Sequence, residues 1–564
     1  MEGLKHRVLV VTGGFITGKE KNLFETIRRQ FIQLKNAKSN WYEMMVKFIA
    51  LEPILLFNRA LKKSKNVKLQ KALSQTSTNE SPELTEVILA TLLENESIPY
   101  DLVSVNDLYS DKSAIKKLNQ CDTVFLSTTF FKDFSELIPV IEKLSLPNNK
   151  IIVGGPLTQM FDELWPKTEH VDLIVKGYGE FAVRDIANWI KSDFKDDSVF
   201  STEQAYKKNG IVFYEASQPN STSLDSLQEA NWDIVESYHD MTFNKIHYES
   251  VRGCPYRCSF CNYPYLFNDK TFRYKSATKI ADYWLGLSLK KPDVIINCLD
   301  SLFTMPRKRL KELCEILIEK KFTGKWICYA RSEDLADLSI CHLMQDAGCI
   351  QVNIGLESGS EEILKNMNKG CSVEENKKAI LNCKSIQLTT VCSLIVGFPG
   401  ETKDTLDQTF NLLEETKPDF YFLAPFSTRI QNIPILSEKS KEKFGIWVDT
   451  NPYSIAPYWS HSSMDCSEVG EHVLRIQRKI MKNKISLNAF CTYTAMDNVS
   501  SNDYDELLDL QAKAVTNKNF VFIFFDIAIY LFKNRIQKGL IPACDRISQD
   551  NWYFNFKPWL FLKL

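Results

Sequence analysis

The chain has 564 residues, of which 44% are hydrophobic, 12% aromatic and 25% charged. This composition excludes a disordered chain, and the length predicts about three domains. The 69 lysines and arginines nearly balance the 70 aspartates and glutamates. The overall charge therefore gives no reason to expect a nucleic-acid substrate.

The first residues are polar and charged, where a secretory signal would need an apolar core. The longest apolar run, residues 520–532, contains Asp526 and is shorter than the roughly 20 residues that cross a bilayer. We therefore expect a cytoplasmic protein that does not enter a membrane. In a reducing compartment, the 15 cysteines indicate metal binding or catalysis more than disulfides.

Residues 1–195 alternate short β-rich runs with helical patterns. Strands are predicted at residues 7–12, 102–105, 123–127, 150–153 and 172–175. This alternation predicts an α/β domain of the doubly wound, Rossmann-like type, with a parallel sheet between two layers of helices. Residues 20–80 interrupt the pattern and are expected to form a mostly helical insertion.

Residues 196–245 have little periodicity and are expected to form a connector with a small hairpin around Asn209-Gly210. From residue 246 to residue 430 the alternation resumes, with strands predicted at 248–252, 293–299, 326–330, 351–356, 391–396 and 419–424. Such a series predicts a partial or complete β/α barrel, whose chemistry lies at the carboxyl ends of its strands. Residues 431–564 lose this rhythm and are expected to form a mainly helical C-terminal domain that covers the substrate.

Three closely spaced cysteines follow the first predicted barrel strand, in Arg252-Gly-Cys254-Pro-Tyr-Arg-Cys258-Ser-Phe-Cys261. A structural zinc site would normally need a fourth ligand at matching spacing, and the chain contains no second Cys-x-x-Cys pair. Three thiolates on one loop suit a [4Fe-4S] cluster with one iron left open. Zinc and three unpaired buried cysteines are the alternatives.

The cysteine spacing, together with Phe260 just before the last cysteine, resembles the radical S-adenosylmethionine (SAM) enzymes. The resemblance implies that Cys254, Cys258 and Cys261 hold the cluster and that SAM binds its open iron. It also implies a 5′-deoxyadenosyl radical as the reactive species and an external electron donor such as flavodoxin or ferredoxin.

Segments at the other strand ends extend this resemblance. Asn297-Cys-Leu-Asp300 is similar to an acidic strand-end segment of the family, and Arg331 offers a guanidinium suited to a carboxylate. Gly355-Leu-Glu357-Ser-Gly359, with Met367-Asn-Lys-Gly370, resembles the SAM ribose segment, and Gly397-Phe-Pro-Gly400-Glu401 resembles the adenine-side turn. The resemblance implies SAM contacts for Phe260, Asn297, Asp300, Arg331, Glu357, Ser358, Gly359 and Gly397.

Small and polar residues also end the strands of the first domain, where they would let a ligand approach the backbone. Joined to the barrel, they resemble the cobalamin-binding domain of cobalamin-dependent radical SAM enzymes. The implied cobalamin contacts are Thr12, Gly13, Ser127, Thr128, Gly154, Gly155, Gly177, Tyr178, Gly179 and Glu180. Many cobalamin proteins have Asp-x-His-x-x-Gly after the first strand, whereas residues 12–18 of this chain contain no histidine. Ordinary β/α turns without a cofactor are the alternative.

The leading hypothesis is a cobalamin-dependent radical SAM C-methyltransferase that acts on an unactivated carbon of a peptide or other small natural-product precursor. A second hypothesis keeps the radical and replaces methyl transfer with cyclisation or rearrangement. A third is a non-catalytic iron–sulfur binding or sensor protein. His461, in Trp459-Ser-His-Ser-Ser-Met464, is expected either to face the substrate or to be a structural residue.

Overall fold

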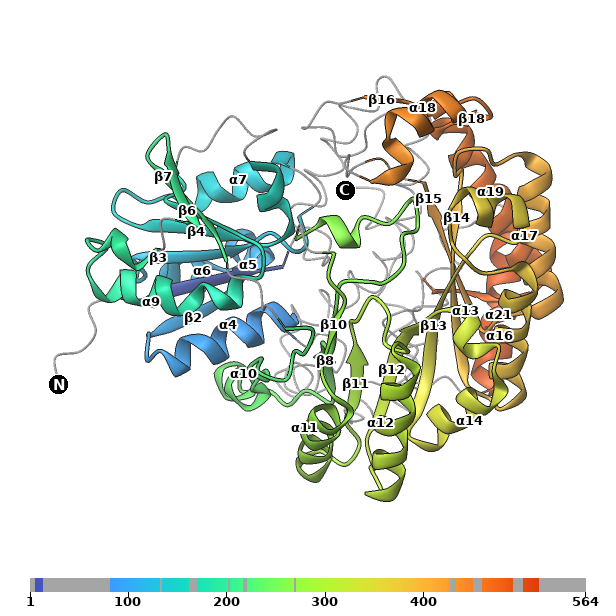
Figure 1. Cartoon of the computed structure of the whole chain (residues 1–564), viewed down its shortest axis with the longest axis horizontal. Helices are drawn as coiled ribbons and strands as arrows, with labels where there is room; N and C mark the ends of the chain where they lie inside the picture. Colours follow the sequence, from blue (N-terminus) through green and yellow to red (C-terminus); the bar gives the residue numbers. More distant parts are fainter. Residues whose placement is uncertain are drawn as a thin grey trace, which may run out of the picture.

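The computed structural model describes residues 6–13, 82–131, 134–161, 170–200, 203–216, 221–267, 270–426, 428, 433–449, 459–489 and 501–516. The predicted insertion at residues 20–80 and the apolar run at 520–532 lie outside these described residues. Figure 1 shows two α/β units side by side, the first coloured blue to teal and the second green to orange.

The first sheet has seven strands in the order β2-β1-β3-β4-β5-β7-β6. Its first five strands in the sequence are parallel and confirm the predicted ones. They are β1 (Val8–Thr12), β2 (Tyr100–Ser104), β3 (Thr123–Ser127), β4 (Lys150–Gly154) and β5 (Leu173–Lys176). Two separate clusters of buried apolar side chains line the faces of this sheet, as expected for parallel strands covered on both sides.

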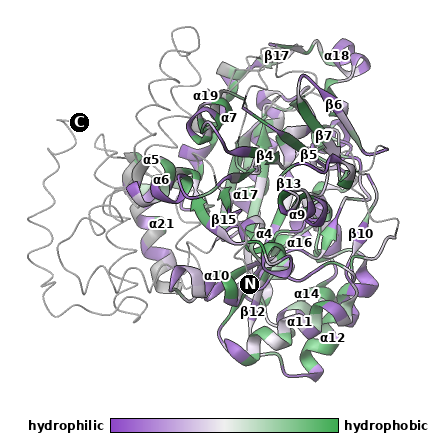
Figure 2. Ribbon diagram, turned by 90° about the vertical axis from the view of Figure 1, so that its left-hand side faces the viewer, coloured by the Kyte–Doolittle hydropathy of each residue, from purple (hydrophilic) through white to green (hydrophobic). Residues whose placement is uncertain are grey.

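The predicted hairpin around Asn209-Gly210 is present, as β6 (Ala205–Lys208) and β7 (Ile211–Glu215). Because β7 pairs in parallel with β5, the hairpin extends the first sheet. The sheet therefore continues into the segment that we expected to be a connector. In Figure 2, β4 and β5 of this sheet are mainly green, whereas the charged helix α18 (Glu438–Phe444) is largely purple.

The second sheet is a partial barrel of seven parallel strands in the order β19-β15-β14-β13-β12-β11-β8. Its strands are β8 (Lys245–Tyr248), β11 (Ile295–Cys298), β12 (Lys325–Ala330), β13 (Cys349–Glu357), β14 (Thr389–Val396), β15 (Phe420–Pro425) and β19 (Leu487–Asn488). The predicted strand at 248–252 is bent into two pieces, β8 and β9 (Val251–Arg252). Strand β9 pairs with β10 (Arg273–Tyr274) outside the barrel.

Some of the described C-terminal residues belong to the barrel. Helix α19 (Cys466–Lys482) leads into β19, which adds a strand beside β15. The sequence did not reveal this unit because β19 is only two residues long. Helix α21 (Ser501–Thr516) packs against α19. None of the described helices combines the length and apolar character that crossing a membrane requires.

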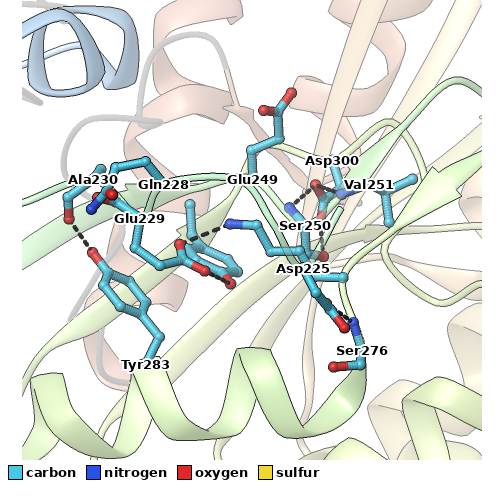
Figure 3. A network of polar contacts seen from close by, with 12 residues as sticks. Asp225, Gln228, Glu229, Ala230, Glu249, Ser250, Val251, Ser276, Tyr283 and Asp300 are labelled. Atoms are coloured by element: carbon cyan, nitrogen blue, oxygen red, sulfur yellow. Dashed lines mark hydrogen bonds and ion pairs between the residues drawn. The ribbon is translucent and has the colours of Figure 1, made fainter. Parts of the chain in front are cut away.

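The segment before the barrel is fastened to helix α11 (Ala277–Lys290) by polar contacts that Figure 3 shows. Asp225 accepts a hydrogen bond of 2.7 Å from the backbone N–H of Ser276, which caps that helix. Tyr283 donates to the carbonyl of Ala230 at 2.6 Å. Lys275 and Glu229 form a buried ion pair at 2.8 Å. These contacts fix the path of the chain into β8.

Asp300 holds the bend between β8 and β9, which is a different role from the predicted SAM contact. Its carboxylate accepts hydrogen bonds from the Ser250 N–H at 2.6 Å, the Val251 N–H at 2.8 Å and the Ser250 hydroxyl at 2.6 Å (Figure 3). The side chain is buried. Burial raises the pKa of Asp300 to about 6, against the opposing effect of these donors. Asp300 therefore positions the strand that leads into the cysteines.

We predict that Asp300→Ala lowers the unfolding free energy by about 2–4 kcal/mol, because it leaves two buried backbone N–H groups without an acceptor. Asp225→Ala is the matched control, since it removes one bond from an exposed carboxylate and should cost about 1 kcal/mol or less. Urea unfolding of both variants measures the difference. Equal decreases in the unfolding free energy of Asp300→Ala and Asp225→Ala would contradict the role of Asp300.

Candidate functional site

The three cysteines lie on a loop, residues 253–262, that follows β9 and is called the cluster loop below. Gly253 opens it with φ = +73°, and a Cβ there would lie 2.1 Å from the carbonyl oxygen of Thr271. Only glycine fits this close approach in this backbone conformation. The loop is then held by Ser259, whose N–H donates to the carbonyl of Met367 at 2.8 Å, and by Asn368, which donates to the carbonyl of Arg257 at 2.8 Å.

The three thiols of the cluster loop differ in their exposure to solvent. Cys258 is buried, and Cys254 and Cys261 are partly exposed. Burial raises the pKa of Cys261 to about 11. A free thiol with this pKa stays protonated at neutral pH, so a bound cation would have to stabilise the thiolate. Among the described residues, no three Cys, His, Asp or Glu side chains converge on a single-ion site.

Arg331 lies directly on the cluster loop. Its Nη1 is 3.7 Å from the Cys258 sulfur, and its guanidinium stacks 3.7 Å from the centre of the Tyr256 ring. Its Nε donates to Glu333 at 2.7 Å, and its Nη2 donates to the carbonyl of Lys369. The side chain is thus committed to protein partners. The SAM contact expected for Arg331 stays a prediction.

Glu357 ends β13 with φ = +64°, an unusual conformation for a residue with a side chain. Its carboxylate folds back over Gly355, where a Cβ would lie 2.5 Å from Oε1. Lys369 pairs with it at 3.1 Å, and both side chains are buried. Lys369 was not singled out in the sequence, although the motif containing it was, because the ion pair spans two separate segments.

Ser358 and Gly359 support the site from behind. The Ser358 hydroxyl is 3.3 Å from the Thr409 hydroxyl, on helix α17 (Lys403–Thr416). A Cβ on Gly359 would lie 2.6 Å from the Cα of Thr409. Both residues are therefore packed against α17, and their expected contacts with SAM stay predictions.

The turn after β14 is enclosed by the C-terminal region. Gly397 has φ = +85°, and a Cβ there would lie 2.1 Å from a methyl carbon of Val469 on α19. Gly397 is thus packed against a helix, and its expected contact with SAM stays a prediction. Phe398 makes an edge contact with Phe260 of the cluster loop, with 6.4 Å between ring centres. Phe260 therefore connects the cluster loop to this turn.

Two ionisable side chains brace the same turn. Glu401 is buried and accepts from the backbone N–H of Gly397, and burial raises the pKa of Glu401 to about 8. His461 Nδ1 accepts from the Ser463 N–H at 3.3 Å, so its Nε2 carries the proton and donates to the Gly397 carbonyl at 3.2 Å. Burial lowers the pKa of His461. These contacts favour the structural alternative for His461.

Asn297 lies on the interior face of the barrel. Its neighbours Ile296 and Cys298 belong to the core under the outer helices, so Asn297 points to the opposite face. It donates to His247 Nδ1 at 3.2 Å. Burial lowers the pKa of His247 to about 4, which keeps the imidazole neutral. Asn297 is therefore placed in the barrel interior, below the strand ends that carry Glu357 and Arg331.

The edge of β1 is occupied by side chains of helix α4 (Leu84–Asn95) and its N-cap. The Thr12 hydroxyl donates to Glu86 at 2.9 Å, and the Gly13 N–H donates to Glu83 at 3.1 Å. Burial raises the pKa of Glu83 to about 8. These hydrogen bonds hold the turn after β1, and the cobalamin contacts expected for Thr12 and Gly13 stay predictions.

The next two strand ends contain both turn-holding and open positions. Thr128 is buried and donates to the Gly154 carbonyl at 2.9 Å, while a Cβ on Gly155 would lie 2.7 Å from its hydroxyl. Thr128 and Gly155 therefore shape the turns. In contrast, a Cβ on Gly154 would meet no atom closer than 3.9 Å, and the Ser127 hydroxyl contacts only its neighbour Thr129, at 2.9 Å.

The turn after β5, Gly177-Tyr-Gly-Glu180, reaches the start of the cluster loop. Glu180 forms an ion pair with Arg252, and the Arg252 guanidinium lies 4.3 Å from the centre of the Tyr178 ring. Tyr178 and Glu180 thus contact the barrel, and the cobalamin contacts expected for them stay predictions. Gly177 has φ = +80°, and Gly179 has no atom within 4 Å of a built Cβ. This turn joins the two sheets at the site.

We predict that Gly253→Ala retains much less iron after anaerobic reconstitution and desalting, because the new methyl group would collide with Thr271 and strain the backbone by about 1–3 kcal/mol. Gly286→Ala is the control. Gly286 is exposed within α11 with no atom near its built Cβ, so that change should be neutral or stabilise the helix by about 1 kcal/mol. Full iron retention by Gly253→Ala would contradict the loop geometry.

We predict that Glu401 makes the protein less stable as pH rises. The folded-state pKa of about 8 exceeds the ordinary 4.5, so the folded form keeps a proton that the unfolded form releases between these values. The unfolding free energy should fall by about 1.4 kcal/mol per pH unit in that window, and this contribution should level off above it. Glu401→Gln should remove this slope. Identical slopes in wild-type and variant unfolding curves would contradict the buried, protonated carboxyl.

The family comparison supports the assignment of the cluster loop. Residues 248–413 match the model of the radical SAM superfamily. The chain is 28% identical over 356 residues to anaerobic magnesium-protoporphyrin IX monomethyl ester cyclase of Rubrivivax gelatinosus, covering 60% of this chain and 62% of that protein. It is 26% identical over 242 residues to bacteriochlorophyllide d C-12(1)-methyltransferase of Chlorobaculum tepidum, covering 41% and 51%. The chain thus spans less than two thirds of these relatives.

Two solved structures have a similar fold over most of this chain. OxsB, a cobalamin-dependent SAM radical enzyme with aqua-cobalamin and SAM bound, has a TM-score of 0.56 at 15% identity, covering 90% of this chain and 89% of OxsB. The radical SAM methyltransferase TsrM of Kitasatospora setae, with cobalamin and a [4Fe-4S] cluster bound, has a TM-score of 0.55 at 15% identity, covering 80% and 96%. A radical SAM domain uses a [4Fe-4S] cluster and SAM, and the three cysteines of the cluster loop fit this cluster. Residues 248–413 therefore form a radical SAM domain, and the chain around them has the multidomain α/β fold shared by OxsB and TsrM.

Proposed function

We propose that this chain is a cobalamin-dependent radical SAM methyltransferase. Its substrate would be an unactivated carbon of a peptide or another small natural-product precursor. An external one-electron donor such as flavodoxin or ferredoxin would reduce the cluster. When bound, the cluster and SAM supply a 5′-deoxyadenosyl radical that removes a hydrogen atom, and cobalamin supplies the methyl group.

The observation that carries this proposal is the meeting of two strand-end edges. The ion pair between Glu180 and Arg252 places the carboxyl edge of the first sheet against the start of the cluster loop. Ligands of doubly wound sheets bind at that edge, and ligands of β/α barrels bind at the corresponding edge of the barrel. A cofactor on the first sheet would therefore face the cofactors of the barrel.

The residues of the barrel have distinct proposed roles. Cys254, Cys258 and Cys261 would each bind one iron, and the fourth iron would remain open for SAM. Arg331 would keep the Cys258 sulfur in place through its 3.7 Å contact. Glu357 would be the acceptor for hydroxyl groups of SAM, since its carboxylate lies at the end of β13 and uses one oxygen for Lys369.

The first sheet fits a corrinoid in part. Gly154 and Gly179 have no described atom closer than 3.9 Å to a built Cβ, and Ser127 contributes a small, buried side chain at the end of β3. The first-strand turn contains no histidine, so this chain would not bind cobalt from below through that motif. We therefore propose that the corrinoid is held by backbone groups at β3, β4 and β5.

A second candidate is a radical SAM cyclase or rearrangement enzyme that transfers no methyl group. The specific observation in its favour is the similarity to two magnesium-protoporphyrin cyclases, which are 28% and 25% identical over more than half of this chain. The two candidates share the cluster and the radical. They differ in whether SAM also donates its methyl group.

We predict that protein reconstituted anaerobically with iron, sulfide and hydroxocobalamin retains about four irons and a stoichiometric amount of corrinoid after desalting. With a strong reductant and SAM, it should form S-adenosylhomocysteine, which records loss of the methyl group, only when corrinoid is present. Absorption spectra and mass spectrometry measure these quantities.

The outcomes separate the candidates. Corrinoid retention without S-adenosylhomocysteine would contradict methyl transfer and favour the cyclase. Four irons without retained corrinoid would contradict cobalamin dependence. Gly179→Val provides a matched test of the site, because it fills the open β5 turn and should weaken corrinoid retention while iron content stays unchanged.

A further inference from the structure

Arg252 is a buried cation held between the two domains. It is only 5% exposed, and it immediately precedes Gly253 and Cys254. On the barrel side, Glu249 accepts from Arg252 Nη2 at 2.7 Å and from Nε at 3.1 Å. On the side of the first domain, Glu180 forms the other ion pair. Removing one partner of a buried guanidinium lowers the unfolding free energy much more than breaking an ion pair on the surface does.

Aromatic contacts fix the same point. The Tyr178 ring lies over the Arg252 guanidinium at 4.3 Å and stacks on Phe267 at 5.0 Å between ring centres. Phe267 belongs to the segment that follows the cluster loop. The turn after β5 therefore contacts the chain on both sides of the three cysteines, through Arg252 before them and Phe267 after them.

The same turn includes the open position Gly179, between Tyr178 and Glu180. A ligand seated at the carboxyl edge of β5 would lie against the backbone of this turn. Any shift of the turn would move the Glu180 carboxylate relative to Arg252. Because Arg252 lies two residues before Cys254, that movement would change both the path of the cluster loop and the charge beside it.

We propose that Tyr178, Glu180 and Arg252 form a positioning contact through which ligand binding on the first sheet changes the reduction potential of the cluster. The inference deepens the proposed function, since it rests on a corrinoid as the ligand of that sheet. None of the three residues would touch the reacting atoms. By linkage, a change in cluster state would alter corrinoid affinity by the same factor.

The test is the midpoint potential of the reduced cluster, followed by electron paramagnetic resonance, with and without hydroxocobalamin. Removing the charge in Glu180→Gln leaves more net positive charge beside the cluster loop. The variant's potential without corrinoid should therefore be more positive than that of the wild type. The corrinoid-induced shift of the wild-type potential should be lost in the variant. Glu180→Asp keeps the charge and should restore part of the shift.

Glu229→Gln is the matched control. Glu229 also forms an ion pair at 2.8 Å, with the buried Lys275, but this pair joins the segment before the barrel to the residue just before the N-cap of α11, outside residues 253–262 of the cluster loop. The Glu229→Gln variant should keep the midpoint potential of the wild type and its corrinoid-induced shift. Iron content and circular dichroism establish that each variant is folded and loaded.

Each result has a defined meaning. Equal potentials for wild type and Glu180→Gln, with and without corrinoid, would overturn the inference. Equal changes in Glu180→Gln and Glu229→Gln would also overturn it, because they would reflect general loosening. If the wild type binds no corrinoid, the proposed function fails, whereas the corrinoid-free potential of Glu180→Gln still tests the contact. If Glu180→Gln does not load iron, Tyr178→Leu, which keeps the ion pair and removes the stacked ring, must shift the potential.

Discussion

In the proposed function, the cluster loop would hold three thiolates around one cluster and leave one iron open, and contacts from several parts of the barrel fix the path of this loop. The loop begins at a glycine with no room for a side chain, and its middle is bonded to the segment after β13. Arg331 supports it from β12, and Asp300 fixes the bend that delivers it. The contacts come from several strands, so the loop geometry depends on the assembled barrel.

Several residues of the strand-end motifs also have packing roles within the barrel. Glycines 359 and 397 make room for Thr409 and Val469, and these contacts close the outer helices onto the strand ends. The motif is therefore partly a packing motif, since a radical site must exclude water and fix its cofactors. Glu357 and Lys369 form the polar group left at the strand ends. The C-terminal region contributes to the same closure through α19 and His461.

The strands of both sheets could be predicted because β/α alternation and strand-end motifs are local in the sequence. The roles of individual side chains could not, because they depend on distant partners. The sequence does not show that Arg331 lies beside Cys258, because the two residues are 73 positions apart in the chain. Likewise, the sequence does not show that the Thr12 hydroxyl donates a hydrogen bond to Glu86 on α4. Strand β19 was missed because two residues carry no periodicity.

The central claim is that the cluster loop builds a SAM-cleaving iron–sulfur site. The most direct measurement is the formation of 5′-deoxyadenosine from SAM by the anaerobically reconstituted and chemically reduced protein, followed by mass spectrometry. The account predicts that the wild type forms this product and that replacing Cys254, Cys258 and Cys261 together with alanine abolishes it. A wild-type protein that is fully loaded with iron and reduced, yet forms no more product than this variant, would contradict the account.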